Sequence, residues 1–139
     1  MKFNAQDLDQ NAITERSKAE ALLIQSGTVA SHRNRSLEEL TETCKYGHAA
    51  EQFLIEKLGF TDDKRRYKDL FDTDGNSVEV KVTTKPSNVY YVIKRLNEYR
   101  PVLWRNISDI VYVFINDRTN TEYVLEGIYR WNGKQFIKS

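Results

Sequence analysis

The sequence predicts an α+β fold (an α/β sandwich) in a single domain, and three observations lead to this prediction. Segment 36–58 carries apolar residues at helical spacing, and segment 4–26 looks helical, with scattered apolar anchors in an otherwise polar stretch. Residues 67–83 instead show the alternation and central turn of a β-hairpin. Residues 109–115 form the continuous apolar run of a strand buried on both faces. With 139 residues, the chain is long enough to build one such domain around its own core.

Composition and charge limit the classes of protein to which the chain could belong. Apolar residues make up 40% of the chain and charged residues 29%, which is ordinary for a soluble globular protein. The net charge of +1 excludes a global basic field, so any nucleic-acid footprint must be local. The only cysteine, Cys44, rules out an internal disulfide framework, and the sequence shows neither a signal peptide nor a membrane-spanning run. We therefore expect a cytoplasmic protein with no membrane partner.

The N-terminal part, residues 1–35, is predicted to be a helical extension and loop that precedes a core of residues 36–139. Its helix is expected over residues 4–26 and to end at Gly27. Because the segment is otherwise polar, it lacks evident partners in a minimal core and is a reasonable place for dimer contacts. The expected apolar anchors of this helix are Leu8, Ile13, Leu22 and Leu23.

The second helix has clear start and stop signals. Ser36 and Glu39 form a capping box, and Gly59 ends the run of helical spacing. Glu51 lies on or beside the apolar face of this helix, where a carboxylate costs free energy unless another group pairs with it. We predict that Glu51 points toward the hairpin; the alternative is that it lies at the edge of the apolar stripe and reaches solvent.

The hairpin carries the strongest chemical signal. In its second strand three valines, at 78, 80 and 82, alternate with Glu79, Lys81 and Thr83, so a carboxylate and an ammonium group share the face turned away from the core. The turn at residues 74–76 makes the preceding strand an antiparallel neighbour, which brings a further carboxylate beside this pair. Two carboxylates next to a lysine are the minimum set for holding a divalent metal and hydrolysing a phosphodiester.

Two aspartates compete for the position beside Glu79, because the loop length sets the register. A three-residue loop pairs Phe71 with Glu79 and puts Asp69 on the active face. A two-residue loop puts Asp72 there instead, paired with Ser77. We prefer Asp69, with Asp72 in reserve.

The C-terminal part completes the pattern. A helix capped by Ser87 or Asn88 is expected to end at Pro101, and it interleaves basic and aromatic residues in a way that suits a nucleic-acid strand. Residues 122–128 form another predicted strand. Asn132-Gly133 is expected to join residues 129–131 and 135–137 as a hairpin.

With Glu51 on a helix, an aspartate on a strand and Glu79-Val80-Lys81 after the turn, the sequence resembles the PD-(D/E)XK nuclease superfamily over residues 45–115. The resemblance implies a restriction-endonuclease-like αβββαβ core with a mixed sheet, here with an extra N-terminal helix and a C-terminal β-hairpin. It also implies a Mg²⁺-dependent DNA nuclease, with Mn²⁺ as a substitute metal. A lysine, Lys68, replaces the proline of the family motif.

The resemblance also implies roles for the site residues. Asp69, Glu79 and the Val80 backbone carbonyl would bind the metal, and Lys81 would position or help to activate the attacking water. Glu51 would complete a second metal position or orient solvent. The alternative is that Glu79 and Lys81 lie on an ordinary solvated sheet face.

We expect DNA as the partner, with RNA left open, and either a homodimer or cleavage directed by DNA shape. A non-catalytic nucleic-acid-binding or regulatory module on the same fold is the second hypothesis. The basic residues expected to contact the nucleic acid are Arg33, Arg35, Lys64, Arg65, Arg66, Lys85, Lys94, Arg95, Arg100 and Arg105.

Overall fold

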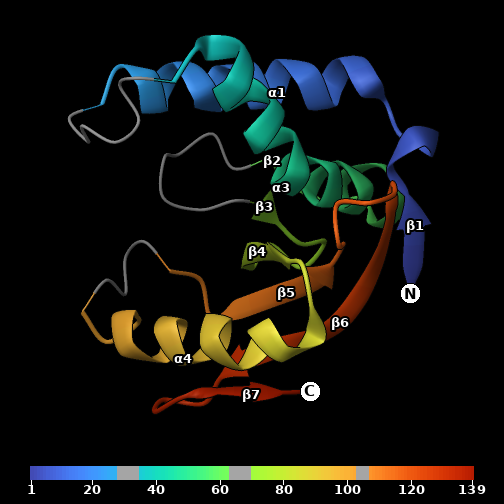
Figure 1. The fold of residues 1–139 in the computed structure, drawn as a ribbon. Coiled ribbons are helices and arrows are strands. Elements are labelled where there is room, and N and C mark those ends of the chain that lie inside the picture. The colour runs from blue at the N-terminus through green and yellow to red at the C-terminus, as the bar shows by residue number, and fades with distance from the viewer. Residues whose placement is uncertain (28–34, 63–69, 103–106) are drawn as a thin grey trace.

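The computed structural model describes residues 1–27, 35–62, 70–102 and 107–139, and these form an α+β fold with a mixed, curled sheet (Figure 1). The described helices are α1 (Gln10–Gln25), α3 (Leu37–Leu58) and α4 (Val89–Tyr99). Figure 1 shows α3 on one side of the sheet, α1 on the outer side of α3, and α4 on the opposite side of the sheet. None of the helices in the described ranges is long and apolar enough to cross a membrane.

The strands follow the order β1-β6-β5-β4-β3-β2 across the sheet, and β7 also pairs with β6. The central strands β4 and β5 are parallel and are connected through α4, whereas the other pairs are antiparallel. From α3 onward the elements run α3-β2-β3-β4-α4-β5. The strands are β1 (Lys2–Asn4), β2 (Thr61–Asp62), β3 (Leu70–Phe71), β4 (Ser77–Thr83), β5 (Ile110–Ile115), β6 (Glu122–Trp131) and β7 (Phe136–Lys138).

The sheet separates two hydrophobic clusters, and alternation along β4 and β5 decides which side chain joins which. Val78, Val80 and Val82 of β4 face α3, where they pack with Phe53 and Leu54. Val111 and Val113 of β5 pack with α4 on the other face. β5 is therefore covered on both sides, since its Ile110 and Phe114 pack in the cluster on the α3 side.

The predicted α3 is confirmed at both ends. The Ser36 side chain accepts a hydrogen bond from the Glu39 amide at 3.1 Å, and Gly59 caps the helix in the left-handed region with φ of 73°. The helix is continuous through Gly47. Glu51 is buried, so the expectation that it lies on the core-seeking side is also confirmed.

We predict that Gly59→Ala lowers the free energy of unfolding by about 1 kcal/mol, because a Cβ disfavours the left-handed conformation. Gly47→Ala is the matched control within the same helix. Nothing in the described part of the chain lies within 4 Å of a Cβ at Gly47, so this change should raise stability by about 0.5–1 kcal/mol. Urea denaturation followed by circular dichroism measures both changes. Equal effects of the same sign would contradict this account of the helix end.

The prediction for the N-terminal segment is wrong in two respects. Residues 2–4 form β1 at the sheet edge and α1 begins only at Gln10, where the Asp9 side chain caps it. Phe3 stacks between Phe53 and Tyr123 at 4.2 and 4.9 Å, so the segment is part of the core and not an extension of it.

The predicted anchors of α1 are also wrong in part. Leu22 and Leu23 are exposed, whereas Ile13, Ser17 and Ala21 are the buried side chains. The small side chains of Ser17 and Ala21 let α1 approach α3 closely. This helix therefore does have a partner within the chain. This removes one reason to expect a dimer, and the oligomeric state itself stays a prediction.

The hairpin register differs from both predicted forms. Phe71 pairs with Ser77 and Leu70 with Val78, which leaves residues 72–76 as the connection. The Asp72 carboxylate accepts hydrogen bonds from the amides of Asp74 and Asn76, and these local bonds favour the longer turn. β2 pairs with β3 and was not among the strands predicted from the residue pattern.

The C-terminal predictions are confirmed in outline. β5 is the strand expected over residues 109–115, and Trp131 pairs with Phe136 across the predicted Asn132-Gly133 turn. The strand before this turn is one continuous element, β6, where we expected two. α4 ends before Pro101 as predicted, but the Asn88 side chain makes no capping bond.

Candidate functional site

Glu79 and Lys81 lie side by side on the face of β4 that is turned toward α4. They pair in the parallel register with Val111 and Val113 of β5, and paired residues share a face. The Lys81 Nζ atom is 3.4 Å from the Glu79 Oε1 atom. The Lys81 side chain is 41% exposed and that of Glu79 12%, so the carboxylate is largely enclosed while the ammonium group reaches solvent.

The structure describes only one of the two candidate aspartates. Asp69 lies outside the described residues, so its role stays a prediction. Asp72 lies inside them and is engaged in the turn: its Oδ1 atom accepts from the Asp74 amide at 3.0 Å and from the Asn76 amide at 2.9 Å. These bonds give Asp72 a structural task that is sufficient to explain its presence.

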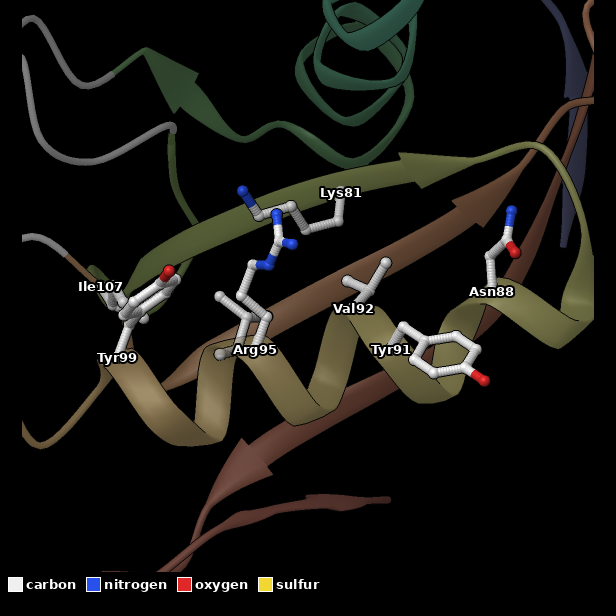
Figure 2. A pocket seen from close by; sticks show the side chains of 8 residues that line it. Lys81, Asn88, Tyr91, Val92, Arg95, Tyr99 and Ile107 are labelled. Atoms are coloured by element: carbon white, nitrogen blue, oxygen red, sulfur yellow. The ribbon is translucent and has the colours of Figure 1, made fainter.

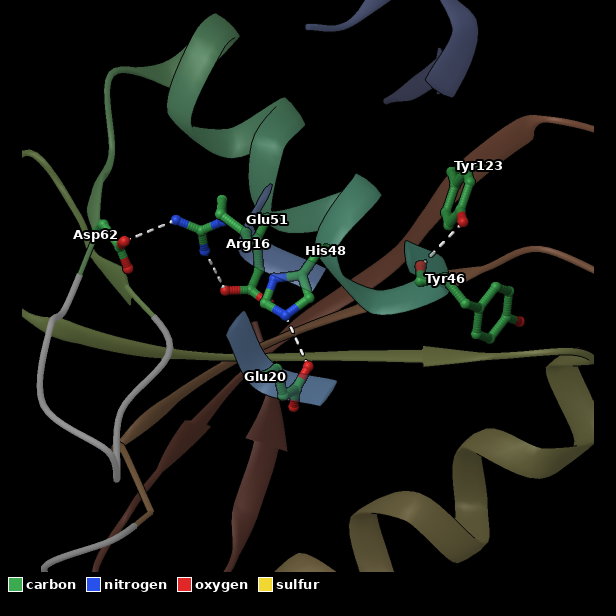
Figure 3. Close-up of polar contacts among 7 residues, drawn as sticks. All are labelled: Arg16, Glu20, Tyr46, His48, Glu51, Asp62 and Tyr123. Atoms are coloured by element: carbon green, nitrogen blue, oxygen red, sulfur yellow. Dashed lines mark hydrogen bonds and ion pairs between the residues drawn. The ribbon is translucent and has the colours of Figure 1, made fainter. Parts of the chain in front are cut away.

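Glu51 is not brought together with Glu79 and Lys81. It lies on the α3 side of the sheet, where Arg16 of α1 donates a hydrogen bond from Nη2 to Glu51 Oε1 at 2.7 Å (Figure 3). The other terminal nitrogen of Arg16 lies 2.9 Å from an Asp62 carboxylate oxygen on β2. Arg16 therefore ties the buried Glu51 to the β2 edge of the sheet, and the pairing satisfies the carboxylate that the helix pattern left unexplained.

His48 extends this cluster to a second carboxylate. Its Nε2 atom lies 2.6 Å from Glu20 Oε2 of α1, and its Nδ1 atom lies 3.2 Å from Glu51 Oε2, a close ionic contact without hydrogen-bond geometry (Figure 3). Burial lowers the pKa of His48, but the contacts with Glu20 and Glu51 outweigh it and raise the pKa to about 9. The bond with His48 is also the main reason that the pKa of Glu20 is lowered. Together these charged groups hold α1 against α3.

A pocket of about 510 Å³ opens between β4 and α4. Lys81 lines it from the strand, and Tyr91, Arg95 and Tyr99 line it from the helix, with apolar side chains such as Leu96 beneath them. Figure 2 shows the Arg95 guanidinium extending from α4 toward the Lys81 side chain. The residues that line this pocket include two cations and no carboxylate.

Among the other residues predicted to contact nucleic acid, some side chains are exposed and others are bound to neighbouring residues. Lys85, Lys94 and Arg95 are exposed. Arg35 donates to the Thr43 hydroxyl at 2.7 Å, and Arg100 is bound to Asp109 and stacks over Trp131, so Arg100 serves the junction of α4 and β5. The predicted contacts that lie outside the described residues are Arg33, Lys64, Arg65, Arg66 and Arg105.

Sequence reasoning missed Arg16 and Glu20 as partners of the α3 residues. Arg16 stands 35 positions before Glu51 in the chain, and its own segment carries no motif. The usable signal was the buried carboxylate on α3, which required a cation from another part of the chain.

In the described ranges, no group of three or more His, Cys, Asp or Glu side chains is arranged to hold a metal ion.

Comparisons with known proteins add no identification. The sequence matches no model of a protein family, and no curated protein matches it either.

Proposed function

We propose that this protein is a Mg²⁺-dependent nuclease that hydrolyses phosphodiester bonds in DNA, built on a restriction-endonuclease-like core. The observation that carries the proposal is the position of the Glu79–Lys81 pair. It lies on the third strand of the series α3-β2-β3-β4-α4-β5, at the edge of a pocket lined by cations. This order of elements corresponds to the αβββαβ core that the sequence resemblance implies.

The donor atoms available on β4 suit magnesium. Mg²⁺ prefers hard oxygen ligands and keeps several waters, so the Glu79 carboxylate and the Val80 carbonyl are suitable donors, and Asp69 is proposed as the second carboxylate. When bound, the metal would polarise the phosphate and lower the pKa of a bound water. Mn²⁺ accepts the same oxygen donors and should substitute.

The chain's own residues supply the rest of the proposed mechanism. Lys81 places a positive charge beside Glu79, where it offsets the negative charge that grows on the phosphoryl oxygens. Arg95, across the pocket, is placed to hold a neighbouring phosphate. Glu51 is bound by Arg16, so in the proposal it acts outside the metal shell and helps to fix the β2 edge through Arg16 and Asp62.

The test uses two closed DNA circles, which have no ends and so report internal cutting, and a branched DNA. Supercoiled plasmid, single-stranded circles and a four-way junction are incubated with the purified protein in Mg²⁺, Mn²⁺ or EDTA. We expect cutting with either metal and none with EDTA, and the preferred form gives the substrate class. A parallel preparation of Glu79→Gln controls for contaminating nuclease; cutting that is equal in both preparations, or absent from the wild type, contradicts the proposal.

The second candidate is a non-catalytic nucleic-acid-binding module. The observation in its favour is the basic and aromatic lining of the pocket beside α4, which needs no metal to bind a strand. DNA binding that is insensitive to EDTA, in a protein that cuts none of the three DNA forms, would favour it.

A further inference from the structure

The pocket between β4 and α4 combines exposed aromatic rings with cations. Tyr91 is 66% exposed and Tyr99 is 47% exposed, although tyrosines on an amphipathic helix usually bury their rings. Exposed aromatic rings that line an open pocket are available for stacking with a planar ligand. The pocket is also within the usual range of ligand sites, at about 510 Å³.

The charges around the rings favour an anionic ligand. Arg95 and Lys81 line the pocket from α4 and β4, and Figure 2 shows the Arg95 guanidinium reaching toward the Lys81 side chain, which runs along β4. In the described part of the chain no carboxylate pairs with Arg95, whereas Arg100, just past the end of α4, is bound to Asp109. Arg95 thus keeps its hydrogen-bond donors for a ligand, and a guanidinium matches the geometry of a phosphate.

We infer that this pocket binds one unpaired nucleotide of a single-stranded DNA segment. Its base would stack on Tyr91 or Tyr99 and its flanking phosphates would contact Arg95 and Lys81. The choice of DNA rests on the proposed function, because Lys81 belongs to both the pocket and the proposed cleavage site. A duplex keeps its bases stacked and so cannot offer one to the rings without extruding it, which makes a single strand, or the unpaired part of a branched DNA, the preferred ligand.

The neighbouring residues of α4 provide matched controls. Tyr90 is 68% exposed and Lys94 is exposed, but both line a different pocket, on the side of α4 near Tyr129. Tyr90 and Tyr91 have the same chemistry and nearly equal exposure but line different pockets, and their rings also meet edge to face with centroids 5.3 Å apart. Lys94 is the exposed cation next to Arg95 in the sequence and lines the second pocket. Leucine replaces each tyrosine so that apolar bulk and helix propensity are kept.

The experiment measures binding in EDTA, so that it does not depend on cutting. Labelled oligothymidylate of about 12 nucleotides is titrated with each variant, alongside an abasic strand of equal length and a duplex. Tyr91→Leu should weaken binding of the oligothymidylate about tenfold and leave abasic-strand binding unchanged, since only the base stacks. Arg95→Ala should weaken the binding of both the oligothymidylate and the abasic strand. It should also lower the slope of log affinity against log salt concentration by about one. Tyr90→Leu and Lys94→Ala should each change binding less than about threefold.

The outcomes separate this inference from the nuclease proposal. Cutting by a protein whose single-strand binding is unaffected by Tyr91→Leu overturns the inference alone. Binding that depends on Tyr91, in a protein that never cuts, supports the pocket and removes the nuclease. Equal losses in Tyr90→Leu and Tyr91→Leu, tighter binding of the duplex, or tighter binding of RNA than of DNA of the same sequence, would each overturn the assignment.

Discussion

Replacing Lys81 with methionine should reduce the rate of DNA cleavage by about 10³-fold, the range typical of removing a charged group that stabilises a transition state. Methionine keeps an unbranched apolar side chain of similar length, so the packing of the lysine stem beside Glu79 is largely preserved. The loss should therefore appear in the rate and not in the fold. Single-turnover cleavage of the preferred DNA form, with protein in excess, measures the chemical step.

Two further variants sharpen this prediction. Lys81→Arg keeps a positive charge beside Glu79 and should retain more activity than Lys81→Met, although a planar guanidinium is a poor replacement for a compact ammonium group. Lys18→Met removes an exposed lysine from α1, on the far side of α3 from the sheet, and should change the rate less than about threefold. A Lys81→Met protein that cuts at close to the wild-type rate would show that the Glu79–Lys81 pair is not catalytic.

The sequence was most informative where local chemistry alone determines the structure. The Ser36–Glu39 capping box and Gly59 set the limits of α3 because both act on backbone groups within one turn. The alternation of valines with Glu79 and Lys81 likewise placed these two side chains on one face, since a strand has a fixed period of two. These features needed no knowledge of distant partners.

Elements that depend on distant partners could not be predicted in the same way. β1 and β2 are three and two residues long, and β1 exists because it pairs with β6 more than a hundred residues away. In α1 the leucines at 22 and 23 looked like anchors, but close contact with α3 selects small residues instead, namely Ser17 and Ala21. A single helix pattern does not reveal how closely its neighbour will approach.

The candidate site shows the same division. That Glu51 is buried followed from its place on the helix, but the cation that pairs with it did not, because Arg16 lies on another helix. The hairpin register was missed because the Asp72 side chain stabilises a longer turn than the Asp74-Gly75-Asn76 pattern indicates. The interleaved tyrosines and arginines indicated a binding surface on α4. Only the structure shows that Tyr91 and Tyr90 line different pockets.

The second large effect expected is a loss of stability as pH rises, caused by His48. Its pKa is raised to about 9 in the folded protein, against about 6.5 for an ordinary histidine, because Glu20 and Glu51 outweigh the effect of burial. A raised pKa means that the folded state holds a proton that the unfolded chain releases. This contribution is complete below about pH 6.5 and disappears as pH rises through about 9. Between about pH 6.5 and 8.5 the free energy of unfolding should fall by about 2 kcal/mol.

Urea denaturation at a series of pH values measures this loss. The highest pH of the series is limited by a second group, Cys44. Burial, followed by the effect of Glu20, raises the pKa of the Cys44 thiol to about 12, so an unfolded thiol that ionises near pH 9 would add a loss of the same sign. Ending the series at about pH 8.5 keeps this contribution small. The charged groups that contact His48 are Glu20 and Glu51.

His48→Gln is the control that assigns the effect to one residue. Glutamine can still donate a hydrogen bond to Glu20 but carries no titrating group, so the variant should be less stable than the wild type at pH 6.5 and should approach it by pH 8.5 as the imidazolium of the wild type is lost. Every other residue of the chain is the same in both proteins, so the effects of the other residues cancel in the difference. A wild-type curve as flat as that of His48→Gln would show that the charge of His48 does not hold α1 against α3. Parallel curves that both fall would assign the pH dependence to another group.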